Sequence, residues 1–68
     1  MKIYVVKARA SIKEALKIID ANNEGLVCIL DDLDKVAGLA TDGDIRRELL
    51  KGASLDEPIE ICSNKDFI

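Results

Sequence analysis

The sequence contains no histidine and no tryptophan, and aromatic residues make up only 3% of it. Histidine is the commonest general base near neutral pH and a frequent metal ligand. Its absence excludes, within this chain, catalytic triads, the zinc motifs of metalloproteases and most sites built on a cysteine nucleophile. Aromatic stacking platforms are scarce, and 10 basic residues are interspersed with 13 acidic ones. DNA or RNA binding is therefore not expected.

Long apolar runs are missing as well. No segment approaches the ~20 apolar residues of a membrane-spanning helix, and the N-terminus lacks the apolar core of a secretion signal. We therefore expect a cytoplasmic protein without a membrane partner. Independent catalysis is not expected either, because carboxylates are plentiful but nothing in the sequence places two of them in a closed pocket.

The chain is short and aliphatic. A protein of 68 residues buries only about 60% of the surface that its unfolded chain exposes. Yet 49% of its residues are apolar. Together they have more apolar surface than so small a protein can bury on its own. We infer a missing neighbour, either a second copy or another part of a longer polypeptide.

The first half of the chain predicts a strand followed by a helix. Residues 3–6 form a short β-type run. Ser11 and Glu14 form a capping box, in which each side chain accepts a hydrogen bond from the other residue's backbone amide. The helix that they open runs to about residue 22 or 23, and Gly25 joins it to the next strand. Its apolar face recurs at a spacing of three and four residues: Ile12, Ala15, Leu16 and Ile19.

The second half predicts a hairpin and a second helix. Residues 26–30 are apolar at every position, as in a strand covered on both faces, and Cys28 within them is predicted to be a buried free thiol. The polar loop 31–35 connects them to a strand at 36–40. Its three aspartates lack the spacing, glycine and distal glutamate of a calcium loop. A helix from about residue 42 or 43 to 51 completes a small α/β fold.

The junction between the last strand and the last helix holds the candidate site. The first amides of a helix have no partners within it, so they attract a side-chain oxygen or a bound anion. In one interpretation Thr41 is the N-cap and Asp44 answers it in a capping box worth ~1 kcal/mol. In the other, the Thr41 hydroxyl and free amides hold a phosphate oxygen, and the Asp44 carboxylate holds a vicinal diol such as ribose.

Charge limits the ligand in this second interpretation. Asp42 and Asp44 both lie at the helix start, where a bare phosphate would meet like charge. Arg46, Arg47 or a partner surface would have to offset that repulsion. A nucleoside monophosphate is therefore favoured over inorganic phosphate.

The order strand, helix, strand, strand, helix, with Gly38-x-x-Thr41-x-x-Asp44 across the last junction, resembles the cystathionine-β-synthase (CBS) domain. Residues 11–16 resemble that family's first-helix signature, and 29–31 its second strand and turn. On this resemblance residues 1–62 form a single CBS motif, and 63–68 begin a second motif or a linker. Where the family usually has Met followed by a small polar residue, this chain has Cys62-Ser63-Asn64.

Residues 41–52 and 55–59 show a narrower resemblance. They resemble the CBS segment attached N-terminally to sugar-phosphate nucleotidyltransferases, although a similar run occurs in arabinose-5-phosphate isomerases. The former is the preferred parent, because those proteins carry the CBS pair at the N-terminus and Met1 lies just before the first motif.

The resemblance implies a regulatory module that works in pairs and modulates an attached enzyme. Two motifs, from a homodimer or from one longer chain, form a pseudo-twofold unit with clefts for AMP, ATP or S-adenosylmethionine. No cofactor or metal is required. The alternative is a structural dimerisation module that binds no nucleotide. The implied nucleotide-binding residues are Thr41 for phosphate, Asp44 for ribose, Leu26, Leu39 and Tyr4 for the base, Gly25 and Gly43 for close approach, and Gly38.

Overall fold

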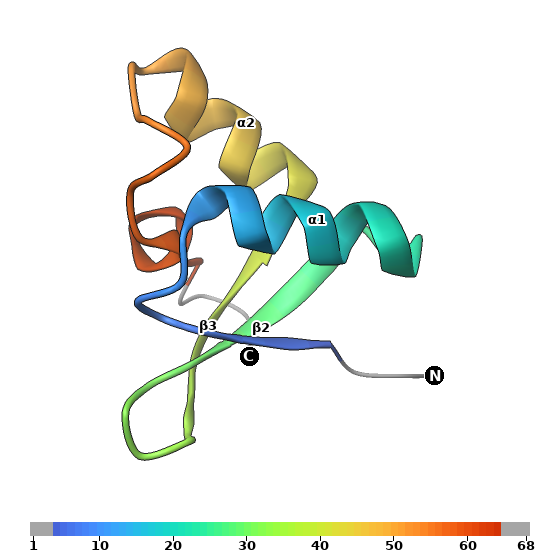
Figure 1. The fold of residues 1–68 in the computed structure, drawn as a ribbon, viewed down its shortest axis with the longest axis vertical. Helices are drawn as coiled ribbons and strands as arrows, with labels where there is room; N and C mark the ends of the chain where they lie inside the picture. Colours follow the sequence, from blue (N-terminus) through green and yellow to red (C-terminus); the bar gives the residue numbers. More distant parts are fainter. Residues whose placement is uncertain (1–3, 65–68) are drawn as a thin grey trace.

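The computed structural model describes residues 4–64 and shows the predicted order of elements (Figure 1). No helix within this part of the chain is long and apolar enough to cross a membrane. The elements are β1 (Val5–Lys7), α1 (Ile12–Asn22), β2 (Leu26–Leu30), β3 (Val36–Thr41), α2 (Asp42–Leu50) and a short 3-10 helix, η1 (Ile59–Cys62). The predicted α/β class and single-motif architecture are confirmed.

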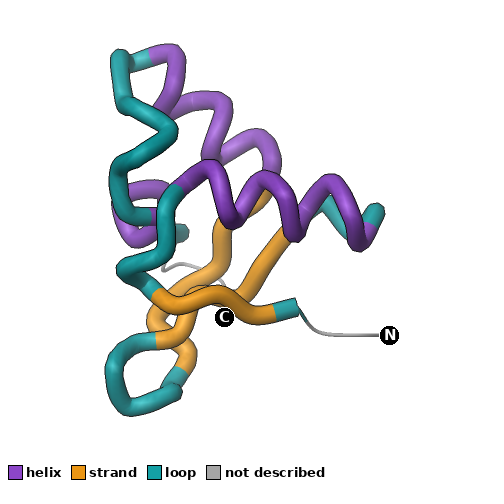
Figure 2. The backbone as a smooth tube through the Cα atoms, viewed as in Figure 1, coloured by secondary structure: helices purple, strands orange, loops and turns teal. Residues whose placement is uncertain are grey.

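The three strands form one sheet in the order β1-β2-β3. β1 runs parallel to β2, to which α1 connects it, and β2 and β3 form an antiparallel hairpin. Both helices lie on the same side of this sheet (Figure 1). The chain passes from β3 into α2 with no loop between them (Figure 2). The site residues at this junction are therefore held by a strand on one side and a helix on the other.

The core lies between the sheet and the helices. Alternate residues of β2, Val27 and Ile29, are fully buried because successive side chains of a strand point to opposite faces. Complete burial of a side chain of this size contributes about 1.5–3 kcal/mol. The buried residues are Val6, Ile12, Ala15, Ile19, Val27, Ile29, Ala40, Ile45, Ile59 and Cys62.

The opposite face of the sheet is open, and this corrects the prediction that β2 is covered on both faces. Leu26 of β2 remains 38% exposed and Val5 of β1 48%. The strand register sets Val5, Cys28 and Leu39 side by side across this open face. Cys28 is consequently half-buried, not buried as predicted, and Cys62 is the buried thiol. The unbroken apolar run in β2 was misleading because nothing in the described chain covers one of its two faces.

Element boundaries differ from the predicted ones by a residue or two. β1 begins at Val5, and the predicted first strand residue, Ile3, lies outside the described residues. Ser11 caps α1 by accepting a hydrogen bond from the Glu14 amide at 3.1 Å. α1 ends at Asn22, and its C-cap residue Asn23 has a left-handed φ of 58° before Gly25 turns the chain into β2 with a φ of 77°. Asparagine tolerates this conformation at a helix end, so it takes the part usually played by glycine.

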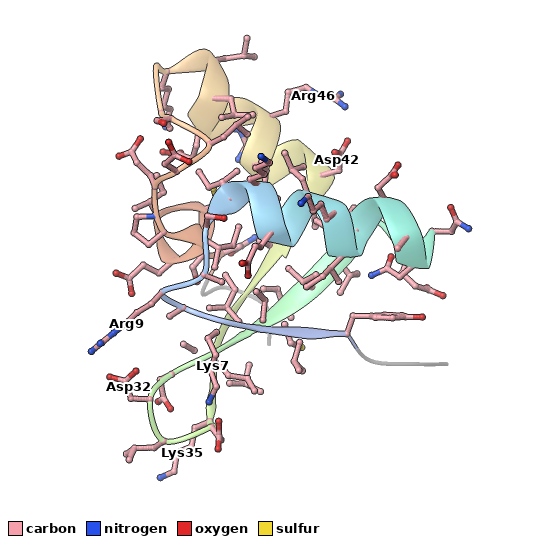
Figure 3. All side chains as sticks on the ribbon, in the orientation of Figure 1. Lys7, Arg9, Asp32, Lys35, Asp42 and Arg46 are labelled. Atoms are coloured by element: carbon pink, nitrogen blue, oxygen red, sulfur yellow. The ribbon has the colours of Figure 1, made fainter. Side chains whose placement is uncertain are left out.

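The aspartates of the β2–β3 turn stabilise the turn and bind basic side chains. Asp31 Oδ1 accepts hydrogen bonds from two backbone amides of the turn, at 2.8 and 3.0 Å. Asp32 pairs with Arg9 at 2.9 Å (Figure 3), and Asp34 pairs with Lys7. These contacts account for the acidic cluster without a bound cation.

Alanine is expected to have opposite effects at Gly43, in the first turn of α2, and at Gly52, just after the end of this helix. A Cβ at Gly43 would meet nothing closer than Thr41 Oγ1 at 3.7 Å, so Gly43→Ala is expected to stabilise the fold by about 0.5 kcal/mol. Gly52 has a φ of 108°, and Gly52→Ala is expected to destabilise it by about 1 kcal/mol. Urea unfolding of both variants tests this pair. A Gly43→Ala protein less stable than the wild type would contradict it.

Candidate functional site

The β3–α2 junction carries a complete capping box. Thr41 Oγ1 accepts a hydrogen bond from the Asp44 amide at 3.1 Å, and Asp44 Oδ2 accepts one from the Thr41 amide at 3.0 Å. The predicted cap is therefore confirmed. It leaves two groups outside the box, the Thr41 hydroxyl proton and Asp44 Oδ1. A capping role and a ligand-binding role are thus compatible at these residues.

Two ion pairs offset the acidic start of α2. Arg46 binds Asp42 with an N–O distance of 2.7 Å (Figure 3), and Arg47 Nη1 lies 3.4 Å from Asp44 Oδ1. The arginine side chains are 69% and 65% exposed. Exposed pairs of this kind contribute only about 0–1 kcal/mol, so an incoming ligand could exchange with them at little cost.

A hollow of about 390 Å³ lies between α2 and the segment that follows η1. This size falls within the range of small-molecule sites. One hydroxyl in its lining, Ser63 Oγ, is buried with no hydrogen-bond partner among residues 4–64. The hollow is lined by Asp44, Arg47, Glu48, Ile61, Cys62, Ser63 and Asn64.

Gly38 supports this hollow from behind. A Cβ at position 38 would lie 1.9 Å from Ser63 Oγ and 3.2 Å from the Asn64 carbonyl oxygen. Asn64 also pairs with Leu39 through backbone hydrogen bonds of 2.7 and 3.1 Å. The glycine therefore lets residues 63 and 64 lie directly against β3.

A second hollow, of about 530 Å³, lies where the end of α1 meets the start of α2. The Gly25 carbonyl oxygen accepts a hydrogen bond from the Asp42 amide here at 3.0 Å. This contact joins the α1–β2 connection to the first turn of α2. The lining residues are Leu16, Ile19, Asp20, Asn23, Gly25 and Asp42.

The structure thus distributes the predicted site residues over several places. Leu26 lies opposite Thr41 in the sheet. The Tyr4 carbonyl oxygen accepts a hydrogen bond from the Cys28 amide of β2 at 2.8 Å. Neither of these two hollows is lined by the other predicted site residues, which are Tyr4, Leu26, Gly38, Leu39, Thr41 and Gly43. Residues 61–64 line the same hollow as Asp44 but could not be recognised from the sequence, because they follow a Pro-containing turn and carry no motif.

The thiol of Cys62 is kept in its neutral form. Burial raises its pKa, and the nearby carboxylates of Glu48, Asp44 and Glu57 raise it further. The thiolate is the reactive form of cysteine. Cys62 therefore serves as a small apolar side chain at the base of the hollow and not as a nucleophile.

Comparison with known proteins identifies the family. A family model for the CBS domain matches residues 1–51. The chain belongs to the CBS-domain family. It is 35% identical over 68 residues to an uncharacterised 17.7 kDa protein of Acidianus ambivalens, covering 96% of this chain and 39% of that protein. It is 39% identical over 54 residues to the arabinose 5-phosphate isomerase GutQ of Escherichia coli O6:H1, covering 79% and 17%.

Solved CBS-domain structures share the fold. An Agrobacterium tumefaciens CBS-domain protein superposes with a TM-score of 0.87 at 25% identity, covering 98% of this chain and 52% of that one. A Pyrobaculum aerophilum CBS domain protein complexed with AMP gives 0.86 at 19% identity, covering 96% and 51%. CbpB in complex with c-di-AMP gives 0.86 at 14% identity, covering 97% and 47%.

These matches establish the general role of the chain. It is a CBS regulatory module and not a catalytic domain. The chain spans about half the length of the solved structures and 39% or less of the two curated relatives. CBS motifs work in pairs, and this chain corresponds to one motif of such a pair.

The raised pKa of Cys62 predicts a loss of stability at alkaline pH. The folded protein holds this proton more tightly than the unfolded chain, so the stabilisation is complete below the ordinary pKa of 9.0 and is lost as pH rises through the folded value. Unfolding free energies measured from pH 8 upward should fall more steeply for Cys28→Ala than for Cys62→Ala. Equal slopes in the two variants would contradict the assignment.

Proposed function

We propose that the chain is half of a paired regulatory module that binds an adenosine nucleotide beside Asp44. The observation that carries this proposal is the state of the Asp44 carboxylate. One oxygen is used in the cap, and the other, Oδ1, lies 3.4 Å from Arg47 Nη1 in a residue that lines a hollow. The AMP complex of the Pyrobaculum protein and the c-di-AMP complex of CbpB support an adenosine ligand.

In this proposal the cap positions the binding atoms. Asp44 Oδ1 accepts a hydrogen bond from a ribose hydroxyl, and the Thr41 hydroxyl donates one to a phosphate oxygen. The positive end of the α2 dipole lies at the same place and favours an anion. Gly43 has no side chain above this first turn, so the ligand can approach the backbone closely.

The base would lie against the open face of the sheet, near the start of the central strand β2. Leu26 is next to Thr41 across the hairpin, and the Tyr4 and Leu39 side chains complete the proposed apolar surface. Gly38 allows residues 63 and 64 to pack against β3, and the space beside Gly25 is open to the close approach of a ligand. Because these residues line neither of the two hollows of one chain, we propose that a second motif covering the sheet completes the base pocket. AMP and ATP are the first ligands to test and S-adenosylmethionine the third.

The open sheet face is the proposed pairing surface, and its occupant is a second motif of the same kind. Val5, Cys28 and Leu39 form an apolar row across it, and Leu26 extends this surface. The Agrobacterium and Pyrobaculum structures are about twice as long as this chain, as a pair of motifs requires. The second motif is supplied by another copy or by a longer chain in which residues 63–68 begin it.

The module would modulate an attached cytoplasmic enzyme that acts on sugar phosphates. The nucleotidyltransferase inferred from residues 41–59 is the first candidate. The GutQ relative favours a sugar-phosphate isomerase as the second. A structural dimerisation module without a nucleotide is the alternative function, and the complete capping box at Thr41 and Asp44 favours it, since the box explains both residues without a ligand.

Calorimetry with AMP and 2′-deoxy-AMP tests the role of Asp44. The wild type should bind AMP about tenfold more tightly than 2′-deoxy-AMP, because one hydrogen bond to a charged group contributes about this much. Asp44→Ala should bind both equally. Asp42→Ala removes the same charge from the same helical turn and should keep the preference. A preserved preference in Asp44→Ala would refute the assigned role, and no heat with AMP, ATP or S-adenosylmethionine would favour the dimerisation module.

Sedimentation velocity tests the pairing surface. Val5→Asp places a charge on the open face, and an unpaired charge in an apolar interface is costly. This variant should sediment as a monomer at concentrations where the wild type is a dimer. Leu50→Asp, at a residue 83% exposed on α2, is the matched control and should remain dimeric. A wild type that is monomeric at every concentration tested would rule out pairing between copies.

A further inference from the structure

We propose that Arg47 sets the preference of this site for anionic ligands. In this proposal the Arg47 guanidinium leaves the Asp44 carboxylate and binds the ligand's phosphate. This inference rests on the proposed function, because it concerns the same hollow. It assigns a role that the adjacent Arg46 does not share. The structure distinguishes the two arginines by the partners that they contact and by the hollow that each partner lines.

Arg47 lies on the oxygen that the ligand needs. Its Nη1 is 3.4 Å from Asp44 Oδ1, whereas the other carboxylate oxygen is held by the cap at 3.0 Å. A ribose hydroxyl that binds Oδ1 therefore competes with the guanidinium for this oxygen. The contact is long for a charge-assisted hydrogen bond, and the arginine side chain is 65% exposed. Displacement consequently costs little, provided that the guanidinium finds another partner.

The charges around the hollow decide what that partner is. Asp44 and Glu48 both line it and both repel an anion. The Glu48 carboxylate is paired with Lys51 at 3.4 Å, which leaves Arg47 as the cation that lines the hollow itself. A phosphate entering beside Asp44 would receive the displaced guanidinium. A neutral nucleoside would displace Arg47 and give it nothing in return.

Arg46 has a different environment. It binds Asp42 at 2.7 Å, and Asp42 lines the other hollow, at the end of α1. Figure 3 shows this pair together on α2. Because the two arginines are adjacent, equally charged and almost equally exposed, they form a matched pair. Replacing either one changes the net charge of the protein by the same amount, but only one replacement changes the charge facing the ligand.

The test compares AMP with adenosine by calorimetry in the wild type, Arg47→Gln, Arg47→Lys and Arg46→Gln. In the wild type AMP should bind at least tenfold more tightly than adenosine. Arg47→Gln should reduce this ratio about tenfold, with weaker AMP binding and unchanged or tighter adenosine binding. Arg46→Gln should leave the ratio unchanged. Arg47→Lys keeps the charge and should retain most of the ratio. Circular dichroism confirms that each variant is folded.

Each outcome separates this inference from the function on which it rests. Equal losses in Arg47→Gln and Arg46→Gln would show a general charge effect and overturn the inference. An unchanged ratio in Arg47→Gln would do the same. A wild type that binds AMP and adenosine equally would leave the nucleotide site intact and reject the role of Arg47. A wild type that binds neither would overturn the proposed function itself.

Discussion

The reciprocal bond between Thr41 and Asp44 is the constraint on which the rest of the molecule depends. It lets α2 begin at the residue after β3, because the box supplies hydrogen-bond acceptors for the Thr41 and Asp44 amides at the helix start. The direction of α2 is thereby fixed relative to the sheet. Ile45 can then be fully buried in the core while Asp44, one residue earlier, faces the hollow beside residues 61–64.

The same bond links stability with ligand binding. The box uses Thr41 Oγ1 and Asp44 Oδ2 as acceptors. The Thr41 hydroxyl proton and Asp44 Oδ1 are left for a ligand. The fold therefore prepares these atoms before a ligand arrives, and the ordering cost of binding is reduced. A ligand that binds only this folded arrangement stabilises it in turn, by an amount that grows with its concentration. Stability and occupancy of the site rise together for that reason.

Local patterns in the sequence predicted what local interactions decide. The element order, the helix faces and the box at Thr41 could all be read from spacing, since each depends on residues within about four positions. Packing against distant segments could not. The half-buried state of Cys28 depends on what covers the open sheet face, and the burial of Cys62 depends on how η1 meets α2. The placement of Ser63 behind Gly38 joins positions far apart in the sequence and has no motif of its own.

The open face explains why so small a chain is so rich in aliphatic residues. A sheet with helices on one side needs apolar residues only at alternate positions of β2, yet the intervening Leu26, Cys28 and Leu30 are apolar too. Their burial by a second motif would add the stability that one motif of this size lacks. Two of the residues proposed for the base, Leu26 and Leu39, belong to that surface. A nucleotide at the seam would therefore contact both motifs and bind most tightly when they are correctly paired, so its differential affinity would bias their arrangement and that of an attached enzyme.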